Sequence, residues 1–155
     1  EPGIQMLISD SIYGVMGNYN KQKEILTKLF EDNIPIETKI YLLHKIAELG
    51  NQDLLKNLAE RLIVSEYKNL NFELEKYIGD ILSDYLEPYD FIEYCNSIFE
   101  KEYVVGVLYS MVRVLDDLGK REESIAVVKE WLDRDPSNSD LNQLHDYMIQ
   151  INSLQ

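Results

Sequence analysis

The chain has 155 residues, and its 15 basic and 28 acidic side chains give a net charge of −13. Residues 71–155 carry 18 of the acidic but only 7 of the basic side chains, so this part would repel a polyanion, and we expect no nucleic-acid partner. No apolar run approaches the ~20 residues of a membrane-spanning helix, and a single cysteine excludes an internal disulfide framework. We therefore expect no membrane insertion.

Turn signals divide the chain into segments of about 13 to 17 residues, which is near the usual length of a helix. In chain order they are Gly17-Asn18, Asn33-Ile34-Pro35, Gly50-Asn51, Asn69-Leu70-Asn71, Glu87-Pro88, Gly119-Lys120 and Asp135-Pro136-Ser137. Between them apolar residues recur at helical spacing, as Leu108, Met111 and Leu115 do. Asp53 and Ser137 stand where they could help to start helices. The sequence predicts an all-α fold of about nine helices in antiparallel pairs.

The turns suggest an internal repeat. Gly17, Gly50 and Gly119 each end a helical run, and their separations of 33 and 69 residues fit one and two units of about 34. The stretch Tyr85-Leu86-Glu87-Pro88 stands where the missing turn is expected, and AELGNQDLLKNLAERL aligns with DDLGKREESIAVVKEW. A helical bundle without repeats is the alternative. We predict one domain over residues 1–155, with helical hairpins at about 3–35, 36–69, 72–104 and 105–138 and a terminal helix at 139–154.

Residues 105–138 resemble a tetratricopeptide repeat (TPR), and residues 36–69 do so less closely. The resemblance rests on Leu118-Gly119, on Ser124-Ile125-Ala126, on Leu132 and on Asp135-Pro136-Ser137-Asn138, with the distance from Gly119 to Pro136 that this family uses. The departures are Val112 and Trp131, which stand where the family has small residues, and a third unit without the turn Gly and the terminal Pro. The resemblance implies a TPR-like superhelix, an α-solenoid that serves as a protein-binding scaffold.

In this family the first helix of each hairpin lines a concave groove, which identifies candidate binding residues. In the best-matching unit this face carries Tyr109, Arg113, Asp116 and Asp117, at positions i, i+4, i+7 and i+8. The positions 69 residues earlier hold His44 and Glu48, together with Ile40 and Ala47; Tyr77, Ile81 and Tyr85 are the expected equivalents in the third unit. The resemblance therefore implies an acidic, Tyr-bearing groove.

The partner that such a groove implies is a basic or neutral protein or peptide. Some family members hold the acidic C-terminus of a chaperone with Lys and Asn side chains on this face. The positions named above contain neither residue type, so we do not expect that partner.

The sequence contains no motif for metal binding, cofactor binding or catalysis. His44 and His145 have no Glu three positions before them and belong to no HExxH motif, so we expect no metal. Cys95 has no activating neighbour in the sequence, and no phosphate-binding glycine motif occurs, so we expect no cofactor and no enzyme. A helical enzyme, a small-ligand sensor and an architectural dimerisation module remain the alternatives to a binding scaffold.

The ends of the chain bear on its context. It begins at Glu1-Pro2-Gly3 without Met or a signal-peptide pattern. We expect a piece of a larger protein, working within a larger complex or a homodimer. A cytoplasmic location is favoured.

Overall fold

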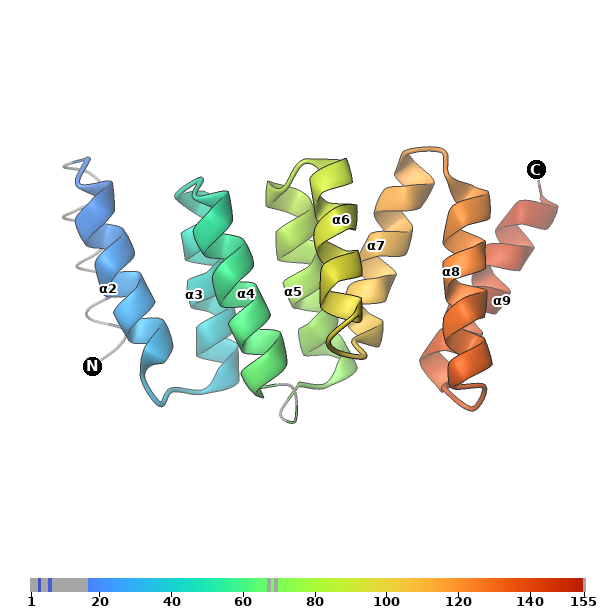
Figure 1. Ribbon diagram of the computed structural model, residues 1–155, viewed down its shortest axis with the longest axis horizontal. Helices are drawn as coiled ribbons and strands as arrows, with labels where there is room; N and C mark the ends of the chain where they lie inside the picture. The colour runs from blue at the N-terminus through green and yellow to red at the C-terminus, as the bar shows by residue number, and fades with distance from the viewer. Residues whose placement is uncertain (1–2, 4–5, 7–16, 67, 69, 155) are drawn as a thin grey trace. The chain divides into compact units, whose positions relative to one another are not determined.

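Helices form most of the described part of the chain. The computed structural model describes Gly3, Met6, residues 17–66, Lys68 and residues 70–154, and this part contains eight α-helices and no strand (Figure 1). The predicted all-α class is thus confirmed. The helix expected before Gly17 lies outside the described residues, so the predicted count of about nine stays a prediction. The helices divide into two compact units, residues 1–70 and 71–155.

The first unit contains three described helices, α2 (Tyr19–Glu31), α3 (Ile36–Glu48) and α4 (Gln52–Glu66). Helix α3 packs against both of the others through fully buried aliphatic side chains such as Leu43 and Ile46. An ion pair of 3.0 Å between Lys39 Nζ and Glu66 Oε1 joins α3 to α4.

The second unit contains α5 (Phe72–Tyr85), α6 (Pro88–Phe99), α7 (Val105–Asp117), α8 (Arg121–Arg134) and α9 (Ser139–Ser153). Helix α7 is its centre, because it contacts the other four helices and nine of its 13 residues are buried. Helix α7 is therefore the core helix of this unit. Bulky Trp131 of α8 lies with its ring 4.8 Å from those of Phe99 and Tyr103.

Local signals set the ends of the helices. Asn18, Asn51, Asn71 and Asn138 accept hydrogen bonds from the backbone N–H three residues later, as N-cap side chains do. These asparagines, rather than the expected Asp53 and Ser137, start their helices. At the other end, Gly50 follows α3 with φ +76° and Gly119 follows α7 with φ +75°. Glycine adopts this left-handed conformation without a steric penalty, which explains the glycines at both turns.

The helix bounds recur with the spacing that the sequence predicts. Helices α7 and α8 begin 69 residues after α3 and α4, and α3 and α7 have the same length of 13 residues. Helices α5 and α6 begin 33 residues before α7 and α8. Successive helices run antiparallel within each unit (Figure 1). The hairpin unit therefore recurs at the level of secondary structure.

Helices α5 and α7 cross in very close contact, and glycines permit it. A Cβ atom on Gly106 would lie 2.5 Å from the backbone nitrogen of Lys76 and 2.6 Å from the carbonyl oxygen of Phe72. A Cβ atom on Gly79 would lie 2.5 Å from Ser110 Oγ. Each helix thus presents a glycine to the other, and any side chain there would separate them.

Replacing Gly106 with Ala should lower the free energy of unfolding of the second unit by about 1–3 kcal/mol, because the methyl group meets backbone atoms that cannot rotate away. The only tryptophan, Trp131, lies in this unit, so urea unfolding followed by its fluorescence measures the change. A G106A variant as stable as the wild type, as the better helix propensity of Ala alone would produce, would contradict the tight crossing.

Candidate functional site

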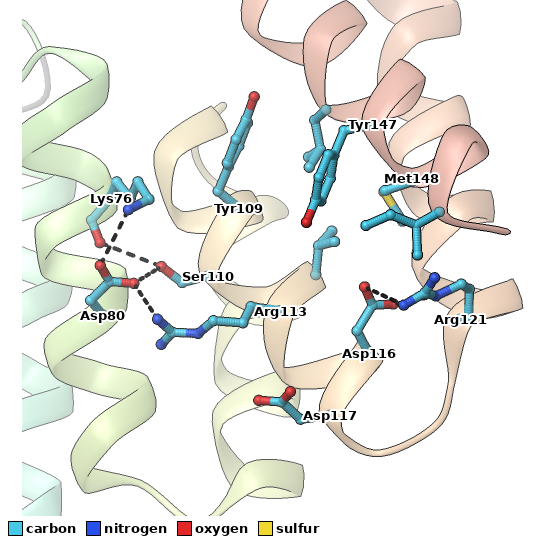
Figure 2. A pocket seen from close by; sticks show the side chains of 13 residues that line it. Lys76, Asp80, Tyr109, Ser110, Arg113, Asp116, Asp117, Arg121, Tyr147 and Met148 are labelled. Atoms are coloured by element: carbon cyan, nitrogen blue, oxygen red, sulfur yellow. Dashed lines mark hydrogen bonds and ion pairs between the residues drawn. The ribbon is translucent and has the colours of Figure 1, made fainter. Parts of the chain in front are cut away.

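The second unit contains a pocket of about 440 Å³ between α5, α7 and α9 (Figure 2). It is lined by Lys76, Asp80, Tyr109, Ser110, Val112, Arg113, Asp116, Asp117, Arg121, Leu144, Tyr147, Met148 and Ile151. Figure 2 shows Lys76, Asp80 and Arg113 on one side, and Tyr147 and Met148 of α9 on the other, with Asp116 and Arg121 below them. The pocket thus combines an apolar wall with polar and charged groups.

Four of the predicted groove residues meet in this pocket. Tyr109, Arg113, Asp116 and Asp117 all line it, because the i, i+4, i+7, i+8 spacing puts them on one face of α7. These four residues therefore share one hollow, and their role in binding stays a prediction.

The other predicted residues lie elsewhere. His44 and Glu48 are on α3 in the first unit, one helical turn apart, with 3.8 Å between His44 Nε2 and Glu48 Oε1. Tyr77 is exposed on α5 and Tyr85 is half-buried near its end, and neither lines the pocket. Ile81, expected beside them, is buried in the core.

The lining residues of α5 are Lys76 and Asp80, which stand 33 residues before Tyr109 and Arg113. The expected register of α5 was therefore displaced by one residue. The correction also places a lysine on this face, which the sequence argument against an acidic partner had assumed to be absent.

A polar network centred on Asp80 joins α5 to α7. Its Oδ1 accepts a hydrogen bond of 2.9 Å from Ser110 Oγ and lies 3.4 Å from Arg113 Nη1. Its Oδ2 lies 3.6 Å from Lys76 Nζ. Arg113 Nη2 also donates to Ser83 Oγ at 2.7 Å. Both cations on this wall are thus held by groups of the protein itself.

A second network closes the turn between α7 and α8. Asp116 Oδ1 accepts a hydrogen bond of 2.9 Å from Ser124 Oγ and lies 3.4 Å from Arg121 Nε. Arg121 Nη2 lies 3.4 Å from the other oxygen of Asp116. Asp116 therefore lines the pocket and also joins α7 to α8. The exposed Asp117 has no ion-pair partner within the described part of the chain.

Two tyrosines, Tyr109 and Tyr147, line the part of the pocket away from the turn between α7 and α8. Tyr109 packs edge-on against Phe72, with 4.8 Å between ring centroids, and its hydroxyl donates to the backbone oxygen of Asp140 at 2.6 Å. Burial, with a smaller effect of the Asp140 carboxylate, raises the pKa of Tyr109. Tyr147 on α9 is 60% exposed, so its ring is free to contact a ligand.

Glu75 of α5 lies beside Gly106, at the start of α7. Burial, with a smaller contribution from the nearby Asp140 carboxylate, raises the pKa of Glu75 to about 7. A hydrogen bond with the Gly106 backbone acts in the opposite direction. The first turn of α7 has no side-chain cap of its own. The Glu75 carboxyl group, on another helix, therefore serves as a hydrogen-bond partner for the backbone of that turn.

Sequence reasoning missed Lys76, Asp80, Arg121 and the α9 residues of the pocket. Lys76 and Asp80 could have been found by a 33-residue offset from Tyr109 and Arg113. The contribution of α9 had a weaker signal, the apolar stripe of Leu144, Met148 and Ile151 within the predicted terminal helix. The lining also holds as many basic as acidic side chains, three of each, and so is less acidic than expected.

Cys95 is fully buried on α6, and burial raises the pKa of its thiol, which disfavours the nucleophilic thiolate. Among the described residues, no group of three or more His, Cys, Asp and Glu side chains could hold a metal ion. None of the described helices is both long and apolar enough to cross a membrane.

Two adjacent carboxylates should differ in their effect on stability. Asp116→Ala should lower the free energy of unfolding of the second unit by about 1–2 kcal/mol, because Arg121 loses its ion-pair partner and Ser124 loses one of its two hydrogen-bond acceptors. Asp117→Ala should change it by less than about 0.5 kcal/mol. Trp131 fluorescence during urea unfolding compares the two, and equal effects would contradict the structural role of Asp116.

Glu75 should make stability depend on pH. Because its pKa is higher in the folded than in the unfolded protein, its folded state binds an extra proton between about pH 4.5 and 7, and stability falls as pH rises through that range. Glu75→Gln should therefore be more stable than the wild type above pH 7, with the difference vanishing towards pH 4.5. Urea unfolding over this range tests it.

Glu73→Gln removes an equal charge from an exposed position of the same helix and serves as the control. If the stabilities of E75Q and E73Q depend on pH in the same way, the partly buried carboxyl of Glu75 is not the cause of the pH dependence.

Comparisons with protein-family models, with curated proteins and with solved structures find no match for this chain.

Proposed function

We propose that this chain is a protein-interaction module of the TPR-like, helical-repeat kind, which binds a short peptide segment of a partner in the pocket between α5, α7 and α9. The observation that carries the proposal is this pocket. Its four predicted residues lie on the first helix of the best-matching hairpin, the position that the family resemblance gives to the groove.

The lining suits a peptide better than a compact polar metabolite. Apolar side chains of Leu144, Met148 and Ile151 form a wall for a partner's aliphatic or aromatic side chain. Tyr147 and the half-exposed Arg113 offer hydrogen-bonding groups at the surface. Tyrosine and arginine are enriched at protein interfaces because they combine a large contact area with polar ends.

The scaffold supports this role by holding the lining residues in place. Gly79 and Gly106 bring α5 and α7 into close contact, and the network around Asp80 fixes the side chains between them. A preformed pocket loses less conformational entropy when a peptide binds. A superhelical stack of such hairpins would extend the same surface, in the manner of other repeat proteins.

The proposal predicts that Tyr147 contributes to peptide binding. A phage-displayed library of random short peptides, selected on the full chain, should yield binders whose affinity falls about tenfold or more with Tyr147→Ala. Titration of the synthesised peptides, followed by fluorescence anisotropy, measures the affinities.

Tyr89→Ala is the matched control, since Tyr89 is 58% exposed on α6 and does not line the pocket. Binders that lose affinity with Y147A but not with Y89A support the pocket as the binding site. A selection that yields no binders, or only binders indifferent to Y147A, would show the proposal to be wrong.

A further inference from the structure

A smaller hollow of about 250 Å³ adjoins the main pocket. The two share Arg113 and Asp117 as lining residues. The remaining lining of this side hollow, which lies within the second unit, consists of Ser83, Asp84, Pro88, Val114 and Leu118. A peptide in the main pocket could therefore place a neighbouring side chain in the side hollow.

The cations along these walls already have anionic partners. Lys76 and Arg113 both pair with Asp80, and Arg121 pairs with Asp116. An acidic ligand would therefore have to compete with a carboxylate of the protein for each of these cations.

The carboxylates of the side hollow are much less engaged. Asp117 has no cation within ion-pair distance in the part of the chain that the structure describes. Asp84 is 68% exposed and reaches only Arg113 Nη2, at 3.9 Å. Arg113 is shared with Asp80, so it does not neutralise both carboxylates. A net negative charge is therefore left in the side hollow.

The positions of these two carboxylates do not favour folding. Asp84 lies in the last turn of α5, and Asp117 is the last residue of α7. The negative end of the helix dipole disfavours a carboxylate at such a place. These carboxylates line a hollow although they do not stabilise the fold, which is the pattern expected of residues kept for binding.

The net charge of the second unit also favours a basic partner. Residues 71–155 carry 18 acidic and 7 basic side chains, so their field attracts a cationic partner and repels an anionic one.

We infer that the partner is a basic peptide segment, in which a Lys or Arg side chain enters the side hollow between Asp84 and Asp117 while a neighbouring apolar side chain occupies the main pocket. This inference rests on the proposed function. The aliphatic stem of the basic side chain would pack on Val114 and Leu118, as long cationic side chains do on apolar surfaces. It narrows the basic or neutral partner expected from the sequence to a basic one.

The test uses pools of short synthetic peptides with a central Leu. One flanking position is fixed as Lys, Arg, Gln or Glu, and all other positions are random. Binding of the full chain to each pool is measured at low salt. The Lys and Arg pools should bind at least about fivefold better than the Glu pool, the effect expected of partly exposed ion pairs.

The double variant Asp84→Asn/Asp117→Asn should abolish this preference while keeping or raising the urea midpoint followed by Trp131 fluorescence. Asp133→Asn, at an exposed position of α8 outside both hollows, should leave the preference unchanged. A role confined to folding would instead lower the urea midpoint of D84N/D117N.

The outcomes separate this inference from the proposed function. Binding of the pools without a charge preference, or a preference that survives in D84N/D117N, would overturn the inference and leave peptide binding intact. Stronger binding of the Glu pool would overturn it as well and would indicate recognition by the basic side chains of the lining. Failure of every pool to bind would overturn peptide binding and this inference together.

Discussion

The close crossing of α5 and α7 is the contact on which the second unit depends. Because neither Gly79 nor Gly106 has a side chain, the two backbones approach until Ser110 reaches the carbonyl oxygen of Lys76 and the carboxylate of Asp80. The pocket needs this separation, since its polar wall comes from both helices. A wider crossing would move Arg113 of α7 away from Asp80 and Asp84 of α5, and these charges would lose their partners on the other helix.

The sequence predicted the helices well because turn chemistry and apolar spacing are local signals. The glycines at 50 and 119 adopt the conformation that ends a helix, and the face of α7 follows from spacing within one helix. The face of α5 was missed by one residue because its turn, Tyr85-Leu86-Glu87-Pro88, has no glycine to fix the alignment. The wall from α9 and the partners of Asp116 were beyond prediction, because they depend on contacts between helices rather than on a pattern within one.

The electrostatics of the site show why composition alone was misleading. The unit is strongly acidic, yet the main pocket is lined by equal numbers of basic and acidic side chains. Most of these charges are used to join helices, as Asp116 does at the turn between α7 and α8. A charge is available to a partner only where the fold has not already paired it, and pairing can be judged only in three dimensions.

The pattern of helix contacts also bears on how the site moves. Helix α9 supplies the apolar wall and packs mainly on α7 and α8. Helix α7, in contrast, contacts four other helices. Local unfolding begins where an element has the fewest partners, so the amide protons of α9 would exchange with solvent sooner than those of α7. The pocket therefore joins a rigid polar wall to a more labile apolar one. A ligand seated between them would slow exchange most in α9, the wall that carries Tyr147.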